Sequence, residues 1–562
     1  MADEGRKRKM QRKKGANLMK NLFKKIGALL VAAVMVLSMC TAAFADAGTD
    51  GIIGTADDTG TITVENVDEE NGVSVSAYPI ALAKYENNTF IGYEKKVSTN
   101  FDLESPTEDQ LKTIFEEVKN DNNKWLPLTK DTNVKTTWSR ANCPVGMYLV
   151  KVSGSESYSY NLAVVSVSYK NENGSNDIEN GVTNMELKDG VTKVKKSSAP
   201  TVDKQIKVSD TTTTKGNTVN IGDKVPYVVT INPIPYYAGK HPVLNVEDIL
   251  SAGLTLDKAS VKVQIKDGDS VADLDPTKYS IVKEDNKLAV NFVVTDDAGN
   301  KSYTLNAYEG KEVVITYKAT VNNNAALNEK DNNNNVTLNY TKDSKVENQN
   351  GTDTDKTYTY TFELDGSIDG QISTEDIIKK TGVEKGQTTS SPLAGAEFTL
   401  YTKKECTTQD KYNNNNTNTK VVNPATSDNK GQLKFTGLAA GEYYLKETKA
   451  PSGYALNTNV FKVVISAVLD ETTGKLKSWT VAVSDANATD GAANSTTFNV
   501  TNEGVASIAG EKANTTEIKN TQLSTLPSTG GMGTYLFTII GVVVMVGAAG
   551  AFFISRRKGS EE

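Results

Sequence analysis

The chain has 562 residues, one histidine, three cysteines and a formal net charge of −7. The charge is uneven: residues 1–45 carry +8, whereas residues 46–529 hold 49 basic and 65 acidic side chains, a net of −16. A strongly acidic body argues against nucleic acid as a partner. One histidine excludes a site that needs two imidazoles, and the two distant cysteines of the body exclude a CxxC metal site or a disulfide framework. We therefore expect neither a metal nor a cofactor.

Residues 1–45 have the pattern of a secretory signal peptide. A basic stretch precedes an apolar run over 26–39, and residues 43–45 (Ala-Phe-Ala) fit the small-x-small cleavage pattern. The mature chain would then begin at Asp46.

The three domains between the ends are predicted to be all-β. Residues 46–199 alternate polar and apolar side chains in several short runs, with one helical insertion at 108–119. Residues 200–354 and 355–505 hold many short β-rich runs separated by turn residues, which is typical of tandem immunoglobulin-like β-sandwiches. The asparagine-rich runs 332–335 and 413–416 are expected as exposed loop tips, and the small, polar stretch 506–525 as a spacer.

The last segment, 526–562, combines three features in a fixed order. A pentapeptide comes first, then an apolar stretch over 535–554, then a basic cluster; the pentapeptide consists of Leu526, Pro527, Ser528, Thr529 and Gly530. Twenty helical residues at ~1.5 Å each reach ~30 Å, the thickness of a bilayer core. The basic cluster should remain on the cytoplasmic side. The pattern predicts a C-terminal transmembrane helix, and the simpler alternative is that this helix is a permanent single-span anchor.

This three-part order resembles the sorting signal of Gram-positive surface proteins, in which sortase recognises LPxTG. The resemblance implies that a sortase cysteine attacks the Thr529 carbonyl, releases Gly530 and holds the chain as a thioester until an amine resolves it. The chain would then be a substrate of sortase and not itself an enzyme.

Sequence motifs in the body are more specific. The strings LAGAEFTLY (393–401), YYLKETKAPSGY (443–454) and FNVTN (498–502) resemble the Cna protein B-type domain, and the second matches the pilin E-box, YxLxETxAPxGY. Residues 200–345 resemble the isopeptide-forming second domain of pilus backbone subunits. With its leader and sorting signal, the chain is identified as a member of the SpaA-type family of sortase-assembled backbone pilins.

This resemblance implies a structural subunit of a covalently polymerised pilus, anchored to the cell wall of a Gram-positive bacterium. The implied partners are sortase, identical pilin subunits, accessory pilins, peptidoglycan and a host surface ligand. The alternative is a wall-anchored adhesin that binds host matrix or glycan without polymerising.

The family's domains carry an amide bond between a lysine of the first strand and an asparagine of the last, assisted by a buried carboxylic acid. Since alternate residues of a strand face one side, strand phase selects candidates. In the second domain, Lys204 is in phase with apolar neighbours, Asp248 is favoured over Glu247, and Asn334 is in phase with Val336. The predicted triad is Lys204, Asp248 and Asn334.

In the third domain, Glu447 is the E-box acid. Asn502 is in phase with Phe498 and Val500, which makes it the candidate asparagine. Lys380 is favoured as the lysine because Lys-Thr-Gly resembles the family's Lys-x-Asp, and Lys379 remains the alternative.

Polymerisation needs a further lysine whose amine resolves the thioester of the next subunit. The family places it in WxxxVxVYPK near the end of the first domain, and the best register here runs from Leu187 to Lys196. The tryptophan, the second valine, the tyrosine and the proline of that motif are absent. Lys196 falls on the nucleophile position, with Lys195 and Lys193 as competitors.

Overall fold

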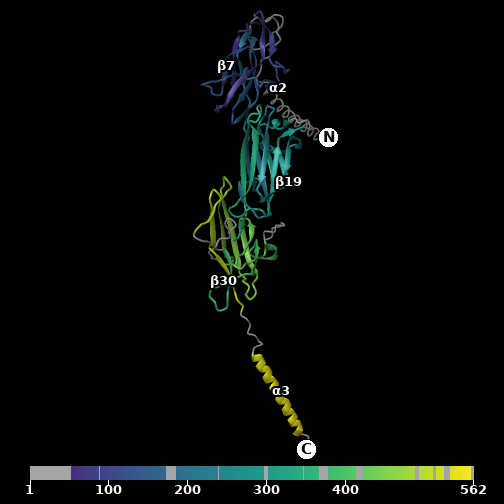
Figure 1. The fold of residues 1–562 in the computed structure, drawn as a ribbon, viewed down its shortest axis with the longest axis vertical. Helices are drawn as coiled ribbons and strands as arrows, with labels where there is room; N and C mark the ends of the chain where they lie inside the picture. The colour runs from purple at the N-terminus through teal and green to yellow at the C-terminus, as the bar shows by residue number, and fades with distance from the viewer. Residues whose placement is uncertain are drawn as a thin grey trace, which may run out of the picture. The chain divides into compact units, whose positions relative to one another are not determined.

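The computed structural model describes residues 52–558 apart from 88, 172–184, 238, 297–300, 346, 366–376, 413–421, 488–492, 511–513 and 524–531. The predicted signal peptide, the pentapeptide 526–530 and the asparagine run 413–416 lie outside the described residues. The chain divides into two compact units. Unit 1 contains the described residues up to Lys215 together with Lys224–Thr320 and Asn333–Thr357; unit 2 contains Gly216–Asp223, Val321–Asn332 and the residues from Tyr358 onward. Strands dominate both units (Figure 1).

The first part of unit 1 is built mainly from antiparallel strands, in one larger sheet and two smaller ones. The larger sheet has the order β1-β4-β3-β8-β10-β11, with β5 beside β3. Its strands are β1 (Ile52–Ile53), β3 (Ser74–Glu86), β4 (Thr89–Lys95), β5 (Leu126–Pro127), β8 (Gly146–Ser153), β10 (Ala163–Asn171) and β11 (Met185–Lys188). The smaller sheets are β12-β2-β7-β6 and β13-β9, made of β2 (Thr59–Glu65), β6 (Thr129–Lys130), β7 (Trp138–Pro144), β9 (Tyr158–Tyr160), β12 (Gly190–Lys193) and β13 (Lys196–Ser198).

The helical insertion predicted at 108–119 is confirmed as α2 (Glu108–Val118). Thr107 caps it by accepting a hydrogen bond from the backbone of Gln110, whose side chain in turn accepts one from the Thr107 backbone. One face of the helix is buried through Leu111, Ile114, Phe115 and Val118. These apolar side chains recur at helical spacing, so their burial stabilises the helix against the sheet.

The second part of unit 1 has two main sheets. One has the order β15-β14-β17-β25-β19-β20 and contains β14 (Thr201–Lys207), β15 (Thr213–Thr214), β17 (Lys224–Asn232), β19 (Leu254–Asp267), β20 (Ser270–Asp273) and β25 (Glu312–Val321). The other sheet has the order β27-β26-β18-β22-β21. Its strands, in chain order, are β18 (Leu244–Leu250), β21 (Ser280–Lys283), β22 (Lys287–Asn291), β26 (Asn332–Thr341) and β27 (Asn350–Tyr360). A short hairpin joins β23 (Val293–Thr295) to β24 (Lys301–Tyr303).

The expectation that residues 332–335 form an exposed loop tip is wrong. They are the first four residues of β26, and Asn332 and Asn334 are buried while Asn335 is exposed. Asparagine is disfavoured in strands, but these two amides find polar partners inside the fold: Asn332 bonds to Ala326, and Asn334 bonds to Tyr317.

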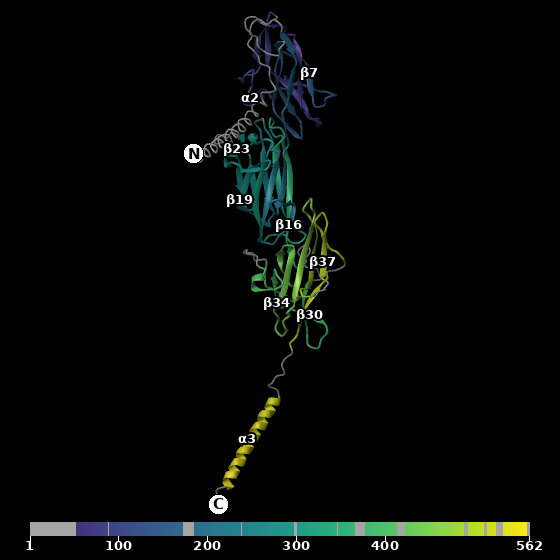
Figure 2. The same ribbon diagram turned by 180° about the vertical axis from the view of Figure 1, so that it is seen from behind.

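Unit 2 is built around one antiparallel sheet, β32-β31-β34-β35-β36-β37-β38, whose strands β34 and β37 are labelled in Figure 2. They are β31 (Glu397–Tyr401), β32 (Ala425–Thr426), β34 (Gly441–Lys449), β35 (Val460–Leu469), β36 (Leu476–Asp485), β37 (Asn494–Val500) and β38 (Ala506–Ile508). A second sheet, β30-β29-β39, contains β29 (Ile378–Val383), β30 (Ser390–Pro392) and β39 (Thr516–Thr521). Shorter pairs join β28 (Phe362–Glu363) to β33 (Thr436–Leu438), and β16 (Gly216–Thr218) to the end of β27.

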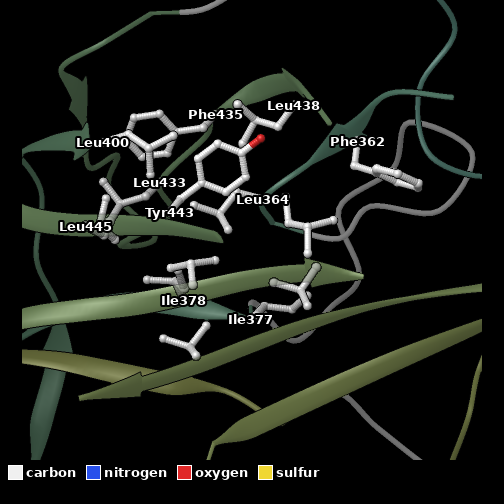
Figure 3. Close-up of a cluster of buried hydrophobic side chains, with 14 of the residues drawn as sticks. Phe362, Leu364, Ile377, Ile378, Leu400, Leu433, Phe435, Leu438, Tyr443 and Leu445 are labelled. Carbon is white, nitrogen blue, oxygen red and sulfur yellow. The ribbon is translucent and has the colours of Figure 1, made fainter. Parts of the chain in front are cut away.

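The core of unit 2 lies between these sheets. Ile378 of β29 and Leu445 of β34 point into the same apolar cluster as Phe435 and Leu438 (Figure 3). Ile518 of β39 belongs to this cluster and is fully buried. The spacer expected over 506–525 is therefore partly wrong, because β38 and β39 belong to the folded unit.

A long apolar helix, α3 (Met532–Lys558), follows β39 in sequence. Its window Leu536–Phe553 has a mean hydropathy of 2.4 and is long enough to cross a membrane. The helix ends in the basic cluster that the sequence places after the apolar stretch.

Candidate cross-linking sites

In the second part of unit 1, the structure brings the three predicted residues together. Lys204 projects inward from β14, because Val202 and Ile206 share its buried face. Asp248 lies on β18, and Asn334 lies on the neighbouring strand β26 of the facing sheet. All three side chains are fully buried. The Lys204 Nζ donates to Asp248 Oδ2 at 2.6 Å, so the lysine reaches from one sheet to the other.

A tyrosine completes this cluster. The Tyr317 hydroxyl on β25 donates to Asp248 Oδ2 at 2.5 Å, and it accepts hydrogen bonds from Lys204 Nζ at 2.6 Å and Asn334 Nδ2 at 2.8 Å. The ring of Tyr227 on β17 stacks on the Tyr317 ring with 5.2 Å between centroids. Tyr317 is not among the residues predicted for this site; within β25, it alternates inward with Val and Ile residues.

Burial sets the electrostatics of this site. It lowers the pKa of Lys204, while the Asp248 carboxylate acts in the opposite direction. A buried ion pair gives back little net stability, because desolvating two charges offsets most of their attraction. A reaction that removes both charges would therefore relieve a cost built into the fold.

Unit 2 holds a second buried cluster that contains a lysine, a carboxylate and an asparagine. Lys380 of β29 is fully buried, and its Nζ donates to Asn520 Oδ1 and, at 3.1 Å, to the Ile518 carbonyl. Asn520 Nδ2 donates to Glu447 Oε1 at 2.8 Å, and the Lys380 Nζ lies 3.7 Å from that oxygen. The other carboxylate oxygen, Oε2, accepts from the Asn457 backbone at 2.8 Å. The cluster thus joins two neighbouring parallel strands, β29 and β39, to an acid on β34.

The prediction of Asn502 as the asparagine of this cluster is wrong. Asn502 is exposed and follows the end of β37, and the contact recorded for it is a hydrogen bond from Lys475 Nζ to its backbone carbonyl. Its place beside the lysine is taken by Asn520, which is 2% exposed. The physical reason is that β37 pairs antiparallel with β36 in the large sheet, whereas β39 pairs directly with the lysine strand.

The choice between the two candidate lysines of β29 follows from strand phase. Lys380 is fully buried in the cluster, whereas Lys379 is half-buried on the opposite face of the strand. Burial lowers the pKa of Lys380 to about 8. At neutral pH a measurable fraction of this amine is therefore neutral, as a nucleophile must be.

This lowered pKa predicts a pH-dependent stability in a chain that cannot form a cross-link. With Asn520 replaced by alanine, Lys380 stays an amine that titrates near 8 when folded and at 10.5 when unfolded. Between these values the unfolded state binds more protons, so the free energy of unfolding should rise with pH, by at most roughly 3 kcal/mol. Urea unfolding of unit 2 between pH 7 and 10.5 measures this. A flat profile in that variant would contradict the prediction.

The lysines considered for polymerisation lie at the end of the first part of unit 1. Lys196 begins β13, which pairs with β9, and its Nζ lies 2.5 Å from Asp68 Oδ2 and 4.5 Å from the Tyr158 ring centroid. The Lys196 side chain is 24% exposed. Lys195 is 41% exposed, and its Nζ lies 2.7 Å from Glu309 Oε2. Both side chains are thus partly exposed, and each amine pairs with a carboxylate.

Asp68 itself is fixed, because its backbone N–H donates to the Tyr160 hydroxyl at 2.8 Å. The sorting pentapeptide, Leu526, Pro527, Ser528, Thr529 and Gly530, lies outside the described residues, between β39 and α3.

The chain combines strand-rich units that hold buried lysine–carboxylate–asparagine clusters with a membrane-length apolar helix near its C-terminus. These features define a class of surface proteins anchored at their C-terminus. Comparison with protein families agrees. Residues 221–344 match the Gram-positive pilin backbone subunit 2, Cna-B-like domain; residues 378–479 match the SpaA prealbumin-like fold domain; residues 518–561 match the LPXTG cell wall anchor motif.

The chain is similar to one curated surface protein and to solved pilin structures. The trypsin-resistant surface T6 protein of Streptococcus pyogenes serotype M6 is 26% identical, over 89% of this chain and 96% of the relative. The solved structure of the T6 backbone pilin of that serotype has the same fold, with a TM-score of 0.50 and 19% identity over 84% of this chain and 100% of that one. The major pilin SpaD from Corynebacterium diphtheriae gives a TM-score of 0.44 and 16% identity over 84% of this chain and 99% of that one.

Three regions of the chain thus match pilin and wall-anchor models, and 89% of the chain is similar to the T6 surface protein. The chain is a structural subunit of a surface pilus anchored to the cell wall, and the matches support this role and not that of a non-polymerised adhesin. The families matched are structural, and the anchor motif implies sortase and peptidoglycan as partners.

Proposed function

We propose that each unit closes its own covalent cross-link, Lys204 to Asn334 in unit 1 and Lys380 to Asn520 in unit 2. The observation that carries this proposal is the full burial of two lysines, each in a hydrogen-bonded cluster with a carboxylate and an asparagine side chain. Soluble proteins almost never bury lysine completely unless it is paired. Two such lysines in one chain, with the same partners, indicate shared chemistry.

The reaction is a condensation. The neutral lysine nitrogen attacks the side-chain carbonyl carbon of the asparagine, a new C–N bond forms, the bond to Nδ2 breaks, and ammonia leaves. The carboxyl group, Asp248 or Glu447, takes the proton of the lysine ammonium and can then donate it to the asparagine carbonyl. Asp248 Oδ1 and Asn334 Oδ1 are both buried and lack a hydrogen-bond partner among the described residues. A proton on Asp248 supplies a donor to this otherwise unsatisfied pair.

The cross-links stiffen the shaft. Each closes a long loop, with 140 residues between the bonded positions in unit 2. By analogy with a disulfide, a loop of this order is worth ~4–5 kcal/mol of chain entropy in the unfolded state. In unit 1 the link also joins the two facing sheets, since Lys204 and Asn334 lie on opposite sides of the sandwich. A pulling force must then break a covalent bond before these sheets separate.

Polymerisation uses a different lysine. Sortase holds one subunit as a thioester at Thr529, and the Lys196 amine of the next subunit resolves it. The Lys196 side chain is partly exposed, and the Asp68 carboxylate beside its amine can accept the proton that the attacking amine loses. Lys195 is the alternative nucleophile.

Peptide mass mapping of the full-length chain, purified from cells without sortase, tests the cross-links. We expect one cross-linked peptide pair that joins Lys204 to Asn334 and another that joins Lys380 to Asn520, each lighter by one ammonia than its two free peptides. Peptides that contain Asn334 or Asn520 as free asparagine in the folded protein would remove the corresponding cross-link.

A further inference from the structure

The Tyr317 hydroxyl is the centre of the unit 1 cluster. It contacts the attacking atom, Lys204 Nζ, at 2.6 Å, and the leaving atom, Asn334 Nδ2, at 2.8 Å. It also contacts the carboxylate of Asp248 at 2.5 Å. A single hydroxyl therefore bridges the nitrogen that loses a proton and the nitrogen that must gain one.

Among the described residues, the unit 2 cluster is arranged differently, and the difference has a simple cause. Glu447 reaches Asn520 Nδ2 directly, at 2.8 Å. Its lysine Nζ lies over the ring of Phe398, 5.8 Å from the centroid, and phenylalanine has no hydroxyl. The acid of unit 1 is an aspartate, one methylene shorter than glutamate. There the asparagine amide donates to Tyr317, and Tyr317 donates to the acid, so the hydroxyl spans the distance that the longer side chain covers in unit 2.

We propose that Tyr317 is a catalytic residue of the Lys204–Asn334 reaction, which relays a proton from the attacking lysine nitrogen to the departing asparagine nitrogen. This inference rests on the proposed cross-link in unit 1. It assigns to Tyr317 the proton transfer between the two nitrogens, for which the lysine, the acid and the asparagine alone provide no direct carrier. Unit 2 performs the same step with its carboxylate.

The step balances as follows. Lys204 first gives its ammonium proton to Asp248 and attacks as a neutral amine. In the tetrahedral adduct, the attacking nitrogen passes one proton to the Tyr317 oxygen while the Tyr317 hydroxyl gives its own proton to Nδ2. The C–Nδ2 bond then breaks and ammonia leaves. Tyr317 ends as it began, with its proton, and nothing is oxidised or reduced. The site favours this neutral form of the relay, because burial raises the pKa of Tyr317 well above its usual value.

The sandwich holds the relay in place. Tyr317 is 2% exposed, and its ring stacks on Tyr227 at an interplanar angle of 25°. Lys204 Nζ lies 5.1 Å from the Tyr317 centroid and 5.2 Å from the Tyr227 centroid, so the amine lies beside both stacked rings. The hydroxyl cannot leave the cluster without repacking both strands that carry these rings.

The test is the variant Tyr317→Phe, which keeps the stacked ring and removes the hydroxyl. The full-length variant chain is purified from cells without sortase, and the two cross-linked peptide pairs are quantified over time after synthesis. We expect the Lys204–Asn334 pair to form at least tenfold more slowly than in the unaltered chain, while the Lys380–Asn520 pair forms at its normal rate. The matched control, Tyr237→Phe, removes another buried hydroxyl of the same sandwich, one that accepts from the Thr341 backbone. It should leave both pairs unchanged.

The outcomes separate the two proposals. If the unaltered chain lacks the Lys204–Asn334 pair, the proposed cross-link fails. If the unaltered chain has it and Tyr317→Phe forms it at the same rate, the cross-link stands and the relay is overturned. Loss of folding is excluded by comparison with Lys204→Ala, which cannot cross-link: a Tyr317→Phe chain that melts no lower than Lys204→Ala is folded, and its slow closure then reports chemistry. A Tyr317→Phe chain that melts well below Lys204→Ala would instead assign Tyr317 a purely structural role.

Discussion

Replacing Asn520 by alanine should abolish the cross-link of unit 2 and lower its stability by ~4–5 kcal/mol, the loop-closure contribution of a bond that spans more than 100 residues. For a unit of this size, that corresponds to a fall in Tm of roughly 10–20 °C. The variant also leaves the Lys380–Glu447 pair buried without its amide partner, which adds to the loss. Scanning calorimetry of the full-length chain, with peptide mapping of the same sample, measures both effects.

Asn502 provides the matched control for this experiment. It is exposed, and the backbone carbonyl that accepts from Lys475 survives the change to alanine. Surface substitutions of this kind usually change stability by no more than about 0.5 kcal/mol. A chain with Asn502→Ala should therefore keep the cross-linked peptide and its Tm. Loss of the cross-link in that variant, and not in Asn520→Ala, would restore the sequence-based choice.

Strand phase located much of both clusters before the structure was known. Alternation over Val202, Lys204 and Ile206 places the lysine inward, and the structure shows it fully buried. The same rule selects Asp248 over Glu247, which is half-buried and paired with Lys287. The rule works because these strands carry apolar neighbours that fix which face meets the core.

The rule failed to find Asn520 because its strand carries almost no apolar signal. β39 reads Thr-Glu-Ile-Lys-Asn-Thr, and Ile518 is its one large apolar residue. The alternation is nevertheless present: Ile518 and Asn520 are buried, and their neighbours are exposed. A short strand held by parallel pairing with β29 and by a polar cluster needs little apolar surface, so composition suggested a spacer. The motif FNVTN, which ends β37, drew the choice to Asn502 instead.

The same alternation also indicates that Tyr317 is buried. It lies within residues 200–354, predicted to hold short β-rich runs, and alternation along β25 places Tyr317 inward with Val313 and Ile315. What the sequence does not contain is the distance between strands of facing sheets, which decides whether a buried tyrosine packs as an apolar ring or bonds to a reacting group. The two clusters thus use one set of residue types in two geometries, across the sandwich in unit 1 and along neighbouring parallel strands in unit 2.

Replacing Lys196 by alanine should abolish the ladder of covalent multimers in wall extracts of a sortase-competent strain and leave the monomer anchored. The effect is expected to be complete, since no other group replaces the attacking amine. The monomer should fold normally, because Lys196 is partly exposed and its ion pair with Asp68 contributes at most about 1 kcal/mol. Immunoblots of wall extracts after boiling in detergent measure the ladder, and peptide mapping of the multimers identifies the linked lysine.

Lys196→Arg separates charge from nucleophilicity. Arginine keeps the positive charge that pairs with Asp68 and can still lie over the Tyr158 ring, but its guanidinium stays protonated and does not attack a thioester. Loss of the ladder in both Lys196→Arg and Lys196→Ala, with an intact ladder in Lys195→Ala, therefore assigns the amine to Lys196. The opposite pattern, a ladder that survives both changes at Lys196 and disappears with Lys195→Ala, moves the nucleophile to the side chain that pairs with Glu309. The register taken from the family motif would then be shifted by one residue, from the strand face that meets Asp68 to the one that meets Glu309.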